Sequence, residues 1–233
     1  MTATAPELPG TNASPRLCLL LFDCDRYADR LLHLDQSEGV LTSCERARAA
    51  RLSDDLAHRR WVCARIALRR ALGAWTGVAF ETRAFEVTAQ GRPYLAAPAP
   101  NFSLSHAGPF ALIAMCSVAA IGADIEQIAP RKISAERRQR LEAFAGQLCS
   151  SPLPDASDAR FVQAWCRIEA VAKAEGCGVG RLLTRAGLMG PASKAAAAGA
   201  QSGIAAGASA TLLRAADLNL GGIAPGFAAA MAG

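Results

Sequence analysis

The chain has 233 residues, of which 52% are hydrophobic and 19% are charged, and its formal net charge is +5. A chain of this length can bury one sizeable core or two small ones, and its modest basic excess favours anionic partners without the dense basic surface of a dedicated nucleic-acid binder. None of the eight cysteines forms a CxxC pair, and the three histidines are widely separated, which argues against a zinc site. We therefore expect free thiols in a reducing compartment.

The N-terminal region predicts neither a signal peptide nor a membrane span. Residues 1–16 are rich in Thr, Ala, Pro and Asn and predict a mobile lead-in. The apolar run 17–22 (LCLLLF) has no basic segment before it and is far too short to cross a membrane, so it predicts a buried strand. We expect a cytoplasmic protein with no membrane partner.

The next stretch of the chain is rich in charge and has a helical period. Trp61, Ile66 and Leu72 recur at roughly helical spacing, which predicts a helix over 43–74. Gly73 is a plausible end for it, because glycine is common where helices stop.

The pattern then changes to that of strands. Residues 85–100 (FEVTAQGRPYLAAPAP) predict a strand that turns through Gly91 and Pro93. Residues 101–108 and 110–118 predict two short strands that form a hairpin-like pair around a Gly-Pro turn.

A second series of elements follows. Residues 119–128 (AAIGADIEQI) predict a further strand, and 134–149 predict a helix with Ser134 as its N-cap. After a loop, 161–176 (FVQAWCRIEAVAKAEG) predict a strong helix that Gly176 ends.

The last part of the chain carries a weaker signal. Residues 186–210 are dominated by Ala, Gly and Ser, a composition that does not separate helix, strand and loop. Residues 210–220 (ATLLRAADLNL) predict a late strand, and the tail 224–233 is uninformative.

The order of these elements predicts two similar halves. A strand, a helix and a hairpin come before residue 118, and a strand, helices and further strands come after it. We therefore expect an α/β (α+β) fold whose halves, 1–118 and 119–233, are each a small sheet packed on helices.

The first candidate for chemistry is the pair Asp124 and Glu126. On a strand, side chains two residues apart share a face, so both carboxylates project together while Ile121 and Ile125 point into the core. A hard divalent cation such as Mg²⁺ would neutralise the two charges. The alternative is a strand end with two solvated acids, and the two residues alone favour this alternative.

The second candidate is one face of the helix over 161–176. Trp165, Glu169 and Lys173 lie four residues apart on a face whose neighbours are mostly apolar. The alternative for Glu169 and Lys173 is an ordinary surface ion pair, which stabilises a helix by about 0.2–0.5 kcal/mol.

Two further sets of residues suit phosphate binding. Ser105 and His106 lie at a strand end before the Gly-Pro turn, where hydroxyl and imidazole groups can bind a phosphate, although a lone histidine is more often structural. Most arginines of the 43–74 helix must be solvated surface, but one or two of them have the geometry to bind phosphate bidentately. This arginine set consists of Arg59, Arg60, Arg65, Arg69 and Arg70.

In this order, the motifs resemble those of the 4′-phosphopantetheinyl transferase superfamily, and most closely its long single-chain type that activates peptide and polyketide synthases. The resemblance covers about 40–180. The segments that carry it are RRWVCARIALR (59–69), GRPYL (91–95), NFSLSHAG (101–108), IGADIE (121–126) and WCRIEAVAKAEG (165–176).

The resemblance implies two pseudo-symmetric α/β halves with coenzyme A bound between them. It also implies Mg²⁺, or Mn²⁺ in its place, on the carboxylates of Asp124, Glu126 and Glu169. The residues that match family contacts to coenzyme A are Arg60, Arg92, Ser105, His106 and Lys173.

The implied activity is that of a holo-[acyl-carrier-protein] synthase, a monomer that moves phosphopantetheine from coenzyme A to a serine of an apo acyl or peptidyl carrier protein. Catalysis would fall to Asp124, Glu169 and Lys173, with Glu169 or a metal-bound water as the base. One departure is Ile168, where many relatives have lysine. The alternatives are another Mg²⁺-dependent phosphoryl hydrolase, or a basic binding module without enzymatic activity.

Overall fold

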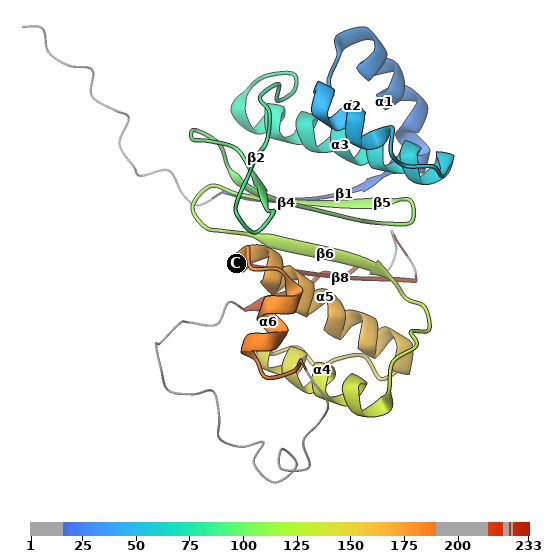
Figure 1. Cartoon of the computed structure of the whole chain (residues 1–233), viewed down its shortest axis with the longest axis vertical. Coiled ribbons are helices and arrows are strands. Elements are labelled where there is room, and N and C mark those ends of the chain that lie inside the picture. The colour runs from blue at the N-terminus through green and yellow to red at the C-terminus, as the bar shows by residue number, and fades with distance from the viewer. Residues whose placement is uncertain (1–15, 190–213, 221–223, 225) are drawn as a thin grey trace, which may run out of the picture.

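The computed structural model describes residues 16–189, 214–220, 224 and 226–233. It is an α+β structure with two small antiparallel sheets that lie between two layers of helices, so the layers run helix, sheet, sheet, helix (Figure 1). The predicted lead-in, except for its last residue, and most of the Ala/Gly-rich stretch lie outside the described residues.

The first sheet contains the three longer strands of the N-terminal half, in the order β1-β5-β4. The strands are β1 (Leu17–Asp23), β4 (Asn101–Ala107) and β5 (Phe110–Cys116). β4 and β5 form the predicted hairpin around Gly108, whose φ of +53° suits a residue without a side chain. The predictions of a strand at 17–22 and of this hairpin are confirmed. The expected burial of that strand is wrong, because β1 lies at the sheet edge and Leu17 and Leu20 are exposed.

Helices cover the outer face of this sheet, and here the sequence prediction is partly wrong. The expected single helix is two helices, α2 (Ser43–Ala49) and α3 (Asp55–Thr76), because Asp54 caps α3 by accepting a 2.6 Å hydrogen bond from the Ala57 amide. The expected end at Gly73 is also wrong, since α3 continues to Thr76 and is capped by Gly77. Before them lies α1 (Cys24–Glu38), a helix that the sequence analysis missed. It is polar on average and buries only Cys24, Ala28, Leu31 and Asp35, so few apolar residues mark it in the sequence.

A short ribbon and a second series of helices complete the structure. The ribbon pairs β2 (Glu86–Val87) with β3 (Pro93–Tyr94), where the sequence predicts a turning strand. The helices of the C-terminal half are α4 (Ala135–Leu148), α5 (Ser157–Glu175) and α6 (Val179–Arg185). α4 and α5 are confirmed, as are the Ser134 cap and the Gly176 stop, whereas α6 was not predicted.

The second sheet has the strand order β6-β8-β7, the same arrangement as the first. Its strands are β6 (Gly122–Gln127), β7 (Ala215–Asp217) and β8 (Phe227–Ala232). In each sheet the central strand is the last strand of its half. β5 lies between β1 and β4, and β8 lies between β6 and β7, so the halves share one topology. The tail that carried no sequence signal supplies the central strand, β8, and its alanines leave room for α5 to pack closely.

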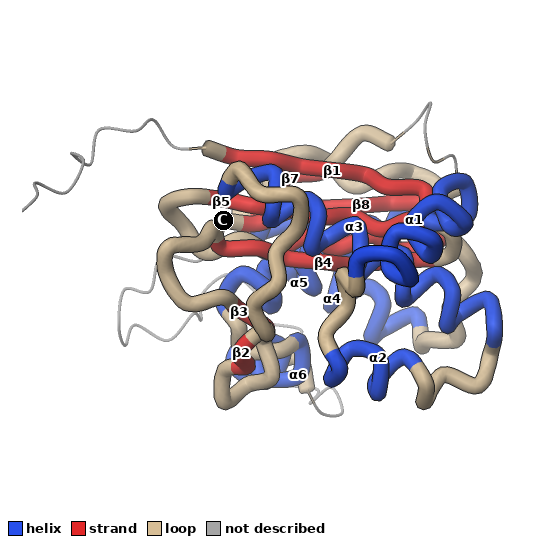
Figure 2. Tube along the Cα trace, turned by 90° about the horizontal axis from the view of Figure 1, so that it is seen from above, coloured by secondary structure: helices blue, strands red, loops and turns tan. Residues whose placement is uncertain are grey.

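The two sheets face each other, with their strands roughly aligned when seen from above (Figure 2). Leu112 and Ala114 of β5 pack with Ile125 of β6 and Ala229 of β8 in the core between the sheets. The predicted core residues Ile121 and Ile125 therefore do point inward, which turns Asp124 toward α5. β4 and β6 are both edge strands and lie side by side.

Polar contacts join the two halves along this edge. The Ala123 amide donates a 3.0 Å hydrogen bond to Ser103 Oγ. The guanidinium of Arg92 donates to the carbonyl oxygens of Ala174, at 2.8 Å, and Ile121, at 3.1 Å. One arginine from the N-terminal half thus holds both the end of α5 and the start of β6.

The close approach of β6 to α5 depends on Gly122. A Cβ atom at this position would lie 1.9 Å from the carbonyl oxygen of Ala170 and 2.5 Å from the amide nitrogen of Ala174, both in the α5 backbone. No side chain fits there unless the strand and the helix move apart.

We predict that Gly122→Ala lowers the free energy of unfolding by about 1–3 kcal/mol, because it overpacks this contact. The matched control is Gly146→Ala in α4, where nothing lies within 4 Å of the added methyl group. That change should raise stability by about 0.5–1 kcal/mol, as expected for alanine in a helix. Urea unfolding of the two variants measures both effects, and equal stabilities would contradict the close packing.

Candidate functional site

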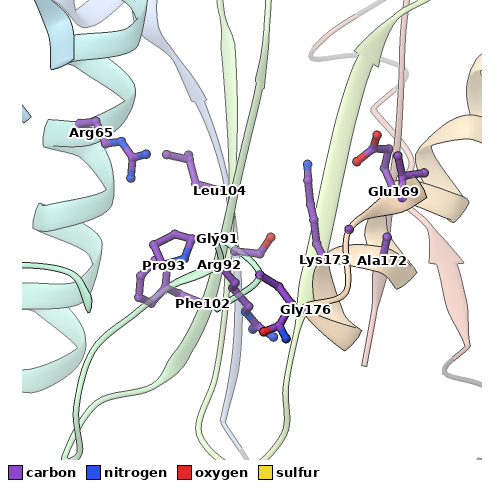
Figure 3. A pocket seen from close by; sticks show the side chains of 14 residues that line it. Arg65, Gly91, Arg92, Pro93, Phe102, Leu104, Glu169, Ala172, Lys173 and Gly176 are labelled. Atoms are coloured by element: carbon purple, nitrogen blue, oxygen red, sulfur yellow. The ribbon is translucent and has the colours of Figure 1, made fainter. Parts of the chain in front are cut away.

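A cavity of about 280 Å³ lies where β4 and α5 meet α3 and the β2–β3 ribbon (Figure 3). Its wall is apolar at Phe102, Leu104 and Val179, and it is charged at Arg65, Lys173 and other positions. Segments far apart in the sequence therefore share one pocket. Four of the matching motifs contribute to it, at Arg65, 91–93, 102–104 and 169–176.

The charged centre beside this cavity is the side chain of Asp124. Only 3% of this residue is exposed. Its Oδ1 accepts hydrogen bonds from Lys173 Nζ at 2.6 Å and from Ser105 Oγ at 2.8 Å. Lys173 also donates to Ser105 Oγ at 3.1 Å and to the Ala123 carbonyl at 3.2 Å. Three residues predicted from separate motifs are thus in direct contact.

This geometry settles two of the open alternatives. Asp124 is a buried and paired acid, so the interpretation as a solvated strand end is wrong for it. Lys173 forms its ion pair with Asp124 from a neighbouring strand. The helix face of Glu169 and Lys173 is accordingly turned toward β6 and the cavity, and is not a solvated surface stripe.

Glu169 is half-buried on the same side of β6. Burial raises the pKa of its carboxyl group, the negative charges of Asp124 and Glu126 raise it further, and Lys173 lowers it. All three predicted carboxylates therefore lie near enough to one another to repel. A cation placed among them would relieve that repulsion.

The fit of these carboxylates to a divalent ion is partial. Asp124 Oδ2 is buried and has no hydrogen-bond partner among the described residues. Buried oxygens are normally bonded, so this oxygen could bind a cation. Glu126, in contrast, forms a 2.9 Å ion pair with Arg131. Within the described part of the chain, no group of three His, Cys, Asp or Glu side chains is gathered closely enough to hold a metal ion. Mg²⁺ commonly takes only one or two protein carboxylates, so Asp124 and Glu169 are the pair that fits it best.

His106 follows Ser105 on β4 and lies on the other face of the strand. It is exposed, yet desolvation of its ring lowers the pKa, and the positive charges of Arg65 and Lys173 lower it further. The imidazole therefore lies within the field of two cations. A phosphate bound beside it would favour its protonated form.

The two predicted arginines have other partners. Arg60 forms a bidentate ion pair with Asp25, at 2.8 and 2.5 Å, and it does not line the cavity. Arg92 does line it, but two of its nitrogens are committed to the carbonyl groups that join the halves. The arginine of α3 that faces the cavity is Arg65, which the sequence could not separate from its four neighbours.

The departure at Ile168 has a structural explanation. Its side chain is fully buried in the core of the C-terminal half, in a cluster that includes Ala164 and Val171 of α5 and residues of α4, α6 and β8. The cavity lining includes its neighbour Glu169 but not Ile168. An apolar residue suits this position, and the geometry of the cavity does not depend on it.

Comparison with models of known protein families gives no match to this chain, and comparison with curated proteins gives none either. Among the helices that the structure describes, none combines the length and the hydropathy needed to cross a bilayer. The function must therefore be argued from the chain's own residues.

We predict that Lys173→Met lowers the free energy of unfolding by about 1–3 kcal/mol, because it leaves the Asp124 carboxylate buried without its counter-ion. The double variant Asp124→Asn/Lys173→Met should recover part of this loss, since no charge is then stranded. Lys132→Met, at an exposed position, is the control and should change stability by no more than about 0.5 kcal/mol. Urea unfolding gives all three values, and a double variant no more stable than Lys173→Met would contradict the pairing.

Proposed function

We propose that this chain is a Mg²⁺-dependent 4′-phosphopantetheinyl transferase. It would move phosphopantetheine from coenzyme A to a serine of an apo carrier protein and release 3′,5′-ADP. One observation carries the proposal: Ser105, Asp124 and Lys173 belong to three separate motifs that resemble this superfamily, and they contact one another beside a cavity.

The cavity suits the chemistry of coenzyme A. Its apolar wall at Phe102, Leu104 and Val179 fits the uncharged parts of the ligand, and Lys173 and Arg65 fit its phosphates. The net charge of +5 favours approach of a carrier protein, since carrier domains are usually acidic.

Phosphoryl transfer depends mainly on neutralising charge and on holding the reacting groups in line. Lys173 supplies a positive charge fixed by Asp124 and Ser105, and it would stabilise the transferring phosphate. Glu169 lines the cavity and would accept the proton of the acceptor serine. Asp124 and Glu169 would hold Mg²⁺, or Mn²⁺, whose positive charge would neutralise the pyrophosphate.

The basic binding module is less well supported by the structure. Three arginines of α3 that a nucleic acid would need are paired with acids of this chain, namely Arg59 with Asp29, Arg60 with Asp25 and Arg69 with Glu45. Paired arginines contribute little to the counter-ion release that drives nucleic-acid binding.

We predict that Glu169→Gln lowers the rate of carrier-protein modification by about 10²-fold or more, because it removes both a proton acceptor and a metal ligand. The fold should persist, since a neutral side chain at this position relieves repulsion with Asp124 and Glu126. The control is Glu136→Gln, an exposed position on α4, which should retain the full rate.

The rate is measured as holo carrier protein formed with coenzyme A and Mg²⁺, followed by mass spectrometry. Near-normal modification by Glu169→Gln would contradict the assignment of the site. Release of orthophosphate from simple phosphate esters, without any preference for coenzyme A, would identify the hydrolase instead.

We further predict that His106→Ala weakens coenzyme A binding by about tenfold, the loss expected for one hydrogen bond to a charged group. Isothermal titration calorimetry measures the dissociation constant. The thermal stability should change little, because His106 is exposed. An unchanged dissociation constant would show that the residue has no part in binding.

A further inference from the structure

The two acids of β6 have different basic partners. Asp124 Oδ1 accepts a 2.6 Å hydrogen bond from Lys173 Nζ of α5. Glu126 Oε2 accepts a 2.9 Å hydrogen bond from Arg131 Nη2, in the loop between β6 and α4. Side chains two residues apart on a strand share a face, so both acids could serve one cation. Arg131 thus engages the carboxylate that would be the third protein ligand of that cation.

The face of β6 that carries these acids favours a cation. Asp124 is 3% exposed, and its Oδ2 is buried without a hydrogen-bond partner among the described residues. The charges of Asp124 and Glu126 raise the pKa of Glu169, so the three acids lie within one another's field. Lys173 and Arg131 offset two of these three negative charges. A further positive charge would therefore be favourable here.

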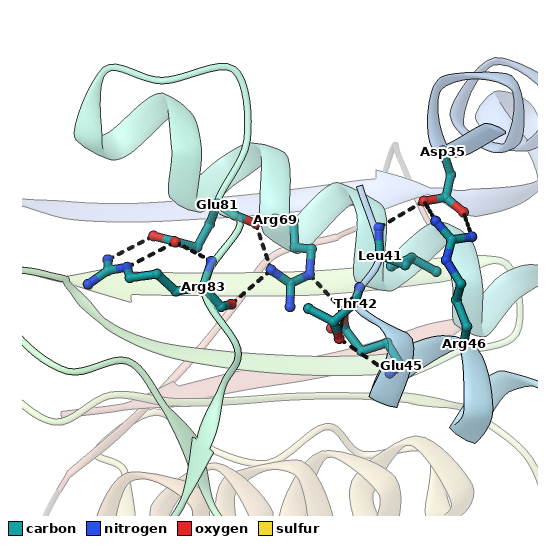
Figure 4. Close-up of polar contacts among 8 residues, drawn as sticks. All are labelled: Asp35, Leu41, Thr42, Glu45, Arg46, Arg69, Glu81 and Arg83. Atoms are coloured by element: carbon teal, nitrogen blue, oxygen red, sulfur yellow. Dashed lines mark hydrogen bonds and ion pairs between the residues drawn. The ribbon is translucent and has the colours of Figure 1, made fainter. Parts of the chain in front are cut away.

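The contact between Arg131 and Glu126 is of a kind that can open. Figure 4 shows the opposite case in Arg69 of α3, which is fully buried and donates to Glu45 at 2.8 Å and to two backbone carbonyl oxygens. The side chain of Arg131 is 45% exposed, and within the described part of the chain a single hydrogen bond joins it to Glu126. Exposed pairs contribute little to stability, so the fold should persist without this one.

Arg131 therefore limits the number of carboxylates that a divalent ion can reach. While it holds Glu126, the ion has only Asp124 and Glu169 as protein ligands, and oxygens of water and substrate must complete its coordination. In agreement, no three His, Cys, Asp or Glu side chains of the described residues are gathered closely enough to hold a metal ion. Without Arg131, Glu126 would be free to add a third negative ligand, and the ion would bind more tightly.

We propose that Arg131 is a positioning residue that holds Glu126 away from the divalent cation and so lowers the metal affinity of the site. The inference rests on the proposed function, which takes Mg²⁺ or Mn²⁺ as the ion at Asp124 and Glu169. A site that binds its ion weakly on its own would take it up together with the anionic substrate, whose phosphate oxygens supply the missing ligands.

The test is a series of Mn²⁺ titrations by calorimetry, in the absence of coenzyme A. Arg131→Gln should lower the dissociation constant of Mn²⁺ by about threefold to tenfold, because it releases one carboxylate to the ion. Arg131→Lys keeps the charge and should stay closer to the unmodified protein. The control is Lys132→Gln, which removes the same charge at the next, exposed position and should change the constant by less than about twofold.

A second background separates the effect of Glu126 from that of charge alone. In Glu126→Gln, the further change Arg131→Gln should alter the dissociation constant by less than about twofold, since no carboxylate is released. An equal gain in this background would show that Arg131 acts only through its general charge, and the proposal would be wrong. An unchanged constant in Arg131→Gln alone would also overturn it, as would a lack of Mn²⁺ binding in every one of these proteins.

Carrier-protein modification by the unmodified protein is measured in parallel, so that the two claims fail separately. If a carrier is modified but Arg131→Gln leaves the Mn²⁺ affinity unchanged, this inference fails and the proposed function stands. If Arg131→Gln tightens Mn²⁺ binding through Glu126 but no carrier is modified, the proposed function fails and the role of Arg131 at the metal site stands.

Discussion

The site depends on how closely β6 lies against α5. At Gly122 the strand approaches the helix so nearly that a single methyl group would collide with the helix backbone. This contact sets the distance between the strand and the helix. Asp124, two residues after Gly122 on the strand, therefore lies within hydrogen-bond distance of Lys173. The ion pair is therefore a consequence of backbone packing. A looser contact would separate the acid from the lysine, and the buried carboxylate would lose its counter-ion.

The second requirement is that the two halves meet along their edge strands. Both halves have the same strand order, but the polar residues at their junction differ, and the difference creates the site. The N-terminal half contributes hydroxyl groups from β4, as at Ser105, whereas the C-terminal half contributes the acid and the lysine. Arg92 then ties the end of α5 to the first half. A ligand in the cavity touches both halves and would stabilise their association.

Much of the fold and the centre of the site follow from the sequence, because they depend on local patterns. The alternation along 121–126 correctly places Ile121 and Ile125 on one face of the strand and Asp124 on the other. The helical period of α5 correctly places Glu169 and Lys173 on one face, which lines the cavity. The central strand β8 is an alanine tail whose role depends on long-range pairing, which no local pattern records. Arg65 is one of five arginines on α3 that the sequence does not distinguish. In the structure Arg60 pairs with Asp25 and Arg69 pairs with Glu45, whereas Arg65 lines the cavity.

The central claim is that this edge of the molecule transfers phosphopantetheine, and one measurement tests it most directly. The protein is incubated with coenzyme A, Mg²⁺ and a panel of apo carrier proteins, and the mass of each carrier is determined. The account predicts that at least one carrier gains the mass of a single phosphopantetheine group on its serine, with an equal amount of 3′,5′-ADP. Unmodified carriers throughout the panel, while a known transferase modifies them under the same conditions, would contradict it.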